Sequence, residues 1–218
     1  MLIFPYLLMV ISPTLKITTH NHKPMKATIY FHLEDQKKKG GKKRRKKQPR
    51  FVIKIAELAE ALEGSYMGLG TPYSPIQVDN FIDLENQEYA SIYPNTKITA
   101  QLVFENPSKK VKAMHLVCCK VTNIDRVHND QLRESPGNPW SGIFKLKRRH
   151  VLPAPDGTLY IAPNSDGECC IHTKKHLADA LLAYTLVFSA TMELEGEGCI
   201  KNYYFVLDPV VKVNSGRD

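Results

Sequence analysis

The chain has 218 residues and an ordinary apolar fraction, which is enough for one sizeable folded domain and a tail. Of its 30 Lys and Arg residues, ten lie between Lys37 and Arg50, where there is no acid, so the remainder carries 20 cations against 22 anions. This distribution excludes a ribosomal-type protein, which spreads its basic residues over a folded surface. It indicates a near-neutral body that carries a basic arm.

Residues 1–36 are predicted to be an N-terminal extension with an apolar start. Residues 1–11 have the apolar character of a signal-peptide h-region, but they lack a basic n-region and a cleavage site. They are also well short of the ~20 residues of a membrane span, so we expect neither secretion nor membrane association. A packed strand, or translation that starts at Met25, are the alternative interpretations. Residues 26–33 are rich in strand-forming side chains.

Residues 37–50 are predicted to be a disordered basic arm, because like charges repel one another and Gly40 and Gly41 add backbone entropy. Beyond Pro49, apolar side chains recur at helical spacing and Gly64 can cap the end. One short helix is therefore expected. Its apolar face would consist of Ile55, Leu58, Ala59 and Leu62.

From about residue 71 onward, short apolar runs are separated by Pro, Gly and Asn turns. Many short strands and few helices predict a mainly β fold, an antiparallel β-sandwich or jelly roll that occupies residues 51–218 as a shell-like domain. A long loop is expected over residues 130–142. Strands are expected at residues 98–104, 111–120, 143–152, 158–161, 180–191 and 199–207.

The basic arm gives the strongest functional signal. Each phosphate that a Lys or Arg neutralises releases condensed counterions, so binding is tight at low salt and weak at high salt. The arm has no side-chain pattern that reads base edges, which predicts sequence-nonspecific binding of nucleic acid. A solubilising tail, or a nuclear localisation signal recognised by import receptors, is the alternative, and import and packaging can share the same residues. The candidate phosphate-binding residues are Lys37, Lys38, Lys39, Lys42, Lys43, Arg44, Arg45, Lys46, Lys47 and Arg50.

A second basic cluster follows the single tryptophan. If residues 143–152 form a strand, Lys145, Lys147 and Arg149 lie on one face and Arg148 lies beside them. Such a stripe is a further candidate phosphate-binding site. A solvated strand face is the alternative interpretation.

Five cysteines form two adjacent pairs and one single residue, a poor disulfide framework that predicts reduced thiols and a cytosolic or nuclear protein. Cys169, Cys170, His172 and His176 lie close together in sequence, but adjacent cysteines on extended backbone point to opposite faces and cannot replace a Cys-x-x-Cys pair. No nucleophile elbow, His-Glu-x-x-His, phosphate loop or dinucleotide fingerprint occurs. We therefore expect no catalytic site, no metal and no cofactor.

Two C-terminal segments, residues 176–184 (HLADALLAY) and 202–210 (NYYFVLDPV), resemble the closing strands of geminivirus coat proteins. Residues 145–149 are similar to the basic strand of those proteins, and residues 114–121 to the apolar strand before it. The resemblance implies a jelly-roll capsid subunit of a small single-stranded DNA virus.

Such a subunit self-associates, directs its arm toward the genome and is found in the virion and the host nucleus. One departure is that arms of this family usually begin at the terminus, whereas residues 1–36 precede the basic run here. The alternative function is that of a monomeric cellular DNA- or RNA-binding accessory protein, nuclear or cytosolic.

Overall fold

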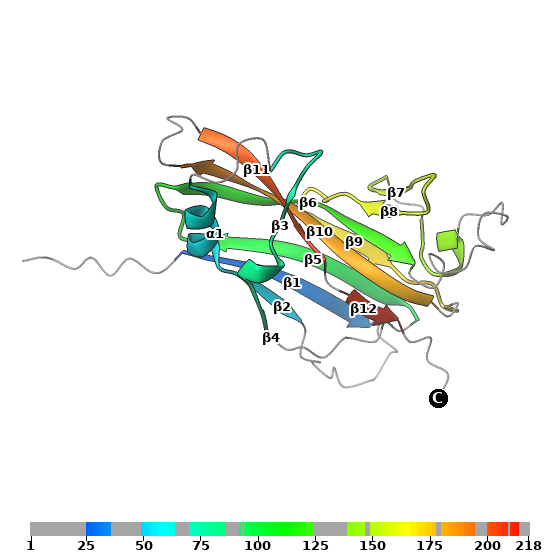
Figure 1. Cartoon of the computed structure of the whole chain (residues 1–218). Coiled ribbons are helices and arrows are strands. Elements are labelled where there is room, and N and C mark those ends of the chain that lie inside the picture. The colour runs from blue at the N-terminus through cyan, green and yellow to red at the C-terminus, as the bar shows by residue number, and fades with distance from the viewer. Residues whose placement is uncertain are drawn as a thin grey trace, which may run out of the picture.

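The chain folds as two β-sheets with one α-helix beside them in the computed structural model (Figure 1). The mainly β fold and the single short helix expected from the sequence are therefore confirmed for the described part of the chain. The described residues are 25–35, 49–63, 70–85, 92, 94–123, 139–146, 149–177, 180–194, 200–208 and 210–213.

The first sheet has five strands in the order β4-β2-β1-β5-β9, and every neighbouring pair is antiparallel. Isolated bridges from Phe144 to Thr173 and from Pro163 to Cys169 cover part of the outer edge of β9. This edge is thereby protected from pairing with another strand. The strands are β1 (Lys26–Asp35), β2 (Arg50–Ile53), β4 (Ile82–Glu85), β5 (Thr96–Glu105) and β9 (Glu168–His172).

The second sheet has the order β3-β11-β10-β6-β8-β7, and β12 also pairs with β10. Its pairs are antiparallel except for β3 with β11, which are parallel. The strands are β3 (Ile76–Gln77), β6 (Val111–Asn123), β7 (Val151–Pro153), β8 (Leu159–Ile161), β10 (Ala180–Glu193), β11 (Ile200–Leu207) and β12 (Val210–Val213).

The inner faces of the two sheets meet in one hydrophobic core. Period-two alternation places Ile29 and Phe31 of β1 in this core, where they are buried. The ring of Phe31 meets the ring of Tyr184 on β10 edge-on, with the ring centroids 5.2 Å apart. The chain crosses between the sheets on both sides of β3, from β5 to β6, and on both sides of β9, so strands from distant parts of the sequence share this core.

Helix α1 (Ile55–Leu62) packs at one end of the sheets (Figure 1). The four apolar residues predicted from their spacing are all buried. Glu63 lies directly after the helix, and its Oε1 forms an ion pair with Lys110 Nζ at 2.7 Å. This ion pair joins the helix to the turn between β5 and β6. Short 3₁₀ turns lie at Asp79–Phe81 and Pro139–Gly142. The predicted cap Gly64 lies outside the described residues.

Most predicted strands are present as β5, β6, β8, β10 and β11. The strand predicted over residues 143–152 is wrong, because only its end forms β7. Trp140 and Phe144 are buried, and the backbone N–H of Lys145 donates to the carbonyl of His172 at 2.9 Å. These contacts hold the segment along the edge of β9, where it makes a turn at residues 149–150 instead of continuing as a strand.

Strand β1 belongs to the same sheet as the rest of the body, although it lies within the predicted N-terminal extension. It pairs with β5 along its whole length and with β2 on its other side. Residues 36–49 therefore link two paired antiparallel strands, and we call them the basic connector. Arg50, the last residue of the predicted disordered arm, is instead the first residue of β2, because it pairs with Tyr30. The disorder predicted for the other nine cations falls on residues outside the described part of the chain.

No helix within the described residues is long and apolar enough to cross a lipid bilayer.

Candidate nucleic-acid interface

The first sheet holds both ends of the basic connector. β1 ends at Asp35, and β2 begins at Arg50, which pairs with Tyr30 in antiparallel register. The backbone N–H of Phe31 donates to the carbonyl of Pro49 at 3.3 Å, so the sheet fixes the end of the connector as well as its start. The nine cations at residues 37–47 are thus tethered to the sheet on both sides, although they lie outside the described residues.

Two aromatic rings and one guanidinium lie on the outer face of the first sheet beside this connector. Because Ile29 and Phe31 face the core, Tyr30 and His32 point to the opposite face. Their rings are parallel within 4° and their centroids are 5.6 Å apart. The guanidinium carbon of exposed Arg50 lies 5.4 Å from the centroid of Tyr30, within the range of a cation–π contact. We call Arg50, Tyr30 and His32 the stacking ladder.

Three exposed cations, Lys145, Arg149 and Lys174, lie along the outer edge of β9, and we call them the edge cluster. Lys145 is held by its bond to the His172 carbonyl, and the N–H of Lys174 donates to the carbonyl of Ile143 at 2.9 Å. The imidazole of His150, next to Arg149, hydrogen-bonds the Cys170 carbonyl at 3.1 Å. Hydrogen bonds to the backbone of the chain therefore hold the edge cluster beside β9. The cations do not lie on one face of a strand, as the sequence predicted.

The edge cluster and the start of the basic connector lie at the same end of the first sheet. Asp35, the last residue of β1, pairs with Thr96, whose N–H donates to the hydroxyl of Thr173 at 2.8 Å. Two inter-strand spacings, about 10 Å, separate β1 from β9. Lys97 lies between them, opposite His172. The fold therefore places the edge cluster at the end of the sheet where the chain enters the basic connector, about 100 residues earlier in the sequence.

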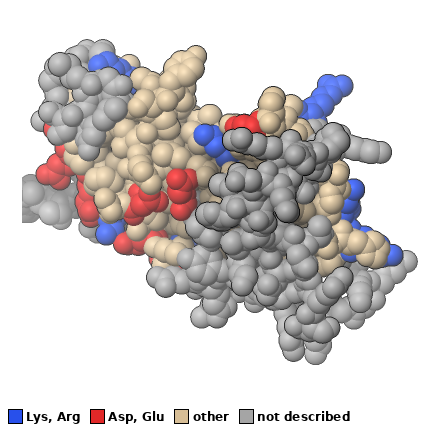
Figure 2. All heavy atoms as spheres, turned by 45° about the vertical axis from the view of Figure 1, so that its right-hand side comes forward, with Lys and Arg blue, Asp and Glu red and all other residues tan. Residues whose placement is uncertain are grey.

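Acidic partners are concentrated at the other end of the molecule. Among the described residues, ion pairs join Lys54 to Asp83, Lys110 to Glu63 and Lys112 to Glu193. Figure 2 shows Asp and Glu side chains gathered toward one end and several Lys and Arg side chains at the opposite edge.

Carboxylates lie on both sides of the ladder, one strand away from Arg50 and two strands away from Tyr30. Glu85 of β4 lies opposite Arg50, and Glu168 of β9 lies opposite Gln101, the neighbour of Tyr30 on β5. Within the described residues, no ion pair joins Glu85 or Glu168 to the ladder. The Arg50 guanidinium contacts the Tyr30 ring.

The two cysteines of β9 point to opposite faces, as extended backbone requires. Cys169 faces the core, where burial and the nearby Cys118 thiol raise its pKa to about 12 against a backbone N–H bond from Cys119. Cys170 points to the opposite face of the sheet, where it is also buried and its Sγ accepts from the Thr99 hydroxyl at 4.0 Å. Burial likewise raises the pKa of Cys119 well above its ordinary value. No group of three or more metal-ligating side chains converges among the residues that the structure describes.

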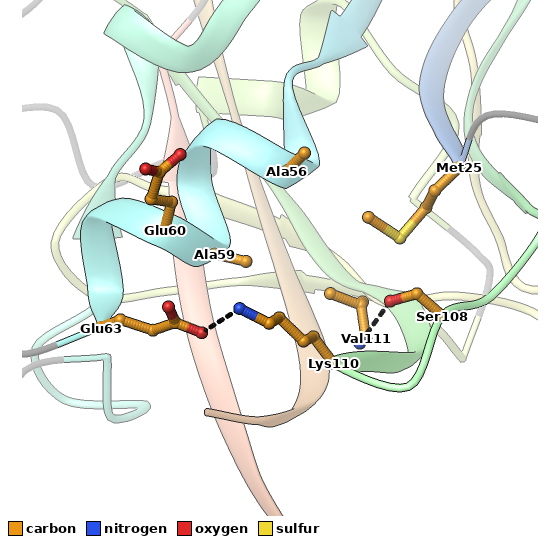
Figure 3. A pocket seen from close by; sticks show the side chains of 8 residues that line it. All are labelled: Met25, Ala56, Ala59, Glu60, Glu63, Ser108, Lys110 and Val111. Carbon is orange, nitrogen blue, oxygen red and sulfur yellow. Dashed lines mark hydrogen bonds and ion pairs between the residues drawn. The ribbon is translucent and has the colours of Figure 1, made fainter. Parts of the chain in front are cut away.

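A pocket of about 270 Å³ opens between α1 and the turn after β5 (Figure 3). The ion pair of Lys110 with Glu63 crosses one side of it, and the N–H of Val111 donates to the Ser108 hydroxyl at 2.9 Å on the other. Met25 and two alanines of α1 complete an apolar wall. The lining offers an ion pair and a capped turn, which are structural contacts, and it lies away from the basic connector.

Sequence reasoning found part of this interface. Arg50, Lys145 and Arg149 are exposed: Arg50 lies in β2 beside Tyr30, and Lys145 and Arg149 lie along the edge of β9. Lys147 and Arg148, like the cations of residues 37–47, lie outside the described part of the chain. The ladder rings Tyr30 and His32 were missed. The signal for them was the alternation of polar rings with core residues in a strand that leads directly into the basic run.

Comparison with protein-family models, curated proteins and solved structures found no match for this chain. Its function is therefore argued from the residues and contacts described above.

Proposed function

We propose that this chain is a viral coat protein that self-assembles and packages nucleic acid, with single-stranded DNA as the preferred genome. The observation that carries the proposal is the concentration of charge. Ten of the 30 Lys and Arg residues lie in one acid-free run, attached at both ends to a β body that is otherwise near neutral. Such a run neutralises phosphates without reading sequence.

The body is compatible with the jelly roll that we propose for it. Strands β5 and β9 are neighbours in the first sheet, and β6 lies between β8 and β10 in the second. The chain changes sheet several times, between β5 and β6 and on both sides of β9 among other places, as it does in a double-sheet shell domain. A neutral body of this kind lets copies approach closely while the basic connectors point toward a shared polyanion.

Three large apolar side chains are exposed on separate elements. Leu152 on β7 is 57% exposed, Ile200 on β11 is 58% exposed and Tyr73 is 99% exposed. Scattered singly, they are ordinary surface residues, so self-association is proposed from the resemblance and from the near-neutral body. We also propose that the basic connector acts as a nuclear import signal, which would place the protein in the host nucleus as well as in the virion.

The test replaces the nine cations of residues 37–47 by Ser and Gly at unchanged length, because deletion would break the link between β1 and β2. Affinity for a fluorescent single-stranded DNA is measured by polarisation over a range of salt. If all nine cations contact phosphate, the variant loses up to about six units of the log–log salt slope. The control variant, K54Q/K112Q, removes two ion-paired cations elsewhere on the body.

We expect the control to bind as the wild type does and the neutral connector to lose most of the affinity. Equal salt slopes for wild type and the neutral connector would contradict the proposal. An accessory protein that stays monomeric would pass this test, and only an assembly measurement separates it from a coat protein.

A further inference from the structure

We infer that the stacking ladder is a base-binding site, so that the interface prefers single strands whose bases are free to stack. This inference rests on the proposed nucleic-acid function and deepens it. The basic connector accounts for phosphate, whereas the ladder gives the same interface a contact with the bases themselves.

The geometry of the ladder supports base stacking. Two parallel rings, with their centroids 5.6 Å apart, lie in line along β1 on the face of the first sheet opposite the core, next to Thr28 and Thr99, which are buried on that face. Both rings are only half-buried, and Arg50 over the Tyr30 ring is exposed. Flat rings and a guanidinium on a sheet surface accept the π-face of any base, and this contact does not depend on sequence.

The position of the ladder supports the same assignment. His32 lies three residues before the end of β1, where the basic connector begins, and Arg50 is the residue that follows the connector. A strand with a phosphate on the Arg50 guanidinium therefore has its bases beside the Tyr30 ring, whose centroid lies 5.4 Å from the guanidinium carbon. Lys97 and Lys145 at the same end of the sheet provide further phosphate contacts beside them.

Single strands are favoured because the bases of a duplex are already stacked on one another and cannot cover a ring without being unpaired. Stacking of one base on an aromatic side chain contributes about tenfold in affinity, by the typical loss on removing the ring. Binding through phosphate contacts alone would give the same affinity for a strand with bases and for a strand that lacks bases.

The experiment compares three fluorescent probes of equal length: oligo-dT, the same backbone made entirely of abasic sites, and a duplex. The full-length protein is titrated with each probe at fixed salt, as wild type and as the variant Y30V/H32V, in which strand-forming residues replace both rings. The ring-preserving variant Y30F/H32Y serves as rescue. The matched control is Y160V, which removes another exposed-face tyrosine with a cation over its ring, Lys120 at 5.8 Å, from the second sheet.

We expect wild type, Y30F/H32Y and Y160V to bind oligo-dT about tenfold or more tightly than the abasic strand. In Y30V/H32V this ratio should fall toward one, while affinity for the abasic strand and its salt slope stay unchanged. Equal binding of both strands by wild type, or equal loss for both strands in Y30V/H32V, would overturn the inference. If no probe binds in a salt-dependent way, the proposed function itself has failed. Circular dichroism of each variant separates these results from misfolding.

Discussion

Replacing Tyr184 by Phe should stabilise the protein, although Tyr184 lies at the centre of the core. Its side chain is fully buried, and its ring contacts Phe31 edge-on between the two sheets. Its hydroxyl oxygen is buried without a hydrogen-bond partner among the described residues. The substitution keeps the ring and its contact and removes only the unsatisfied hydroxyl.

The magnitude follows from the cost of burying a polar group that makes no hydrogen bond, about 1–3 kcal/mol. Loss of the oxygen leaves a space too small for a water molecule, which offsets part of this gain. We therefore expect Y184F to raise the free energy of unfolding by about 1 kcal/mol. For a chain of this size, the melting temperature should rise by about 2–4 °C.

Urea unfolding, followed by tryptophan fluorescence in the presence of a reducing agent, provides the assay. The chain has one tryptophan, Trp140, which is fully buried, so its emission should shift to the red on unfolding. The companion variant F31A removes the partner ring and should cost about 3–5 kcal/mol. A loss of more than about 0.5 kcal/mol in Y184F would refute the reasoning, because the hydroxyl would then have a partner.

Three further predictions concern pH and glycine conformation. The raised pKa of Cys169, to about 12, means that the folded state keeps this thiol protonated while the unfolded state ionises it near pH 9. The free energy of unfolding should therefore be unaffected by this thiol below pH 9 and fall by up to ~1.4 kcal/mol per pH unit above it. The urea midpoint should fall less steeply with pH in C169A than in wild type. Equal pH dependence of the urea midpoint in both proteins would argue against this. Gly70 has φ +77°, and an added Cβ would lie 3.0 Å from Ile76 and Tyr203, so G70A should cost about 2–3 kcal/mol in a thermal melt. Gly157 has φ +81° with open space around it, so G157A should cost only about 1 kcal/mol, and equal losses in the two variants would count against steric crowding at Gly70.

Local patterns in the sequence were sufficient to predict much of the fold. The spacing of Ile55, Leu58 and Leu62 predicts α1, and alternation with terminal turn residues predicts β5 and β10. These elements depend on contacts close in sequence or on one buried face. Their boundaries follow from Pro, Gly and Asn residues that end the pattern.

Long-range contacts explain what local patterns did not predict. Nothing near residues 26–35 indicates that they pair with β5, about 70 residues later, so the sequence did not show that the basic run links two paired strands of one sheet. Residues 145–150 have the alternation of a strand, but burial of Trp140 and Phe144 fixes the path of the backbone first. The ladder requires the register of Tyr30 with Arg50, which the sequence alone does not specify.

The central claim, a coat protein that assembles on nucleic acid, is tested most directly by the size of the particles that the purified protein forms. Light scattering and sedimentation are measured for wild type and for the neutral connector, with and without single-stranded DNA. About ten like charges per copy oppose assembly, so wild type should form large uniform particles only with DNA or at salt that screens them, whereas the neutral connector should assemble without DNA. A protein that binds DNA but stays monomeric under every condition would contradict the claim.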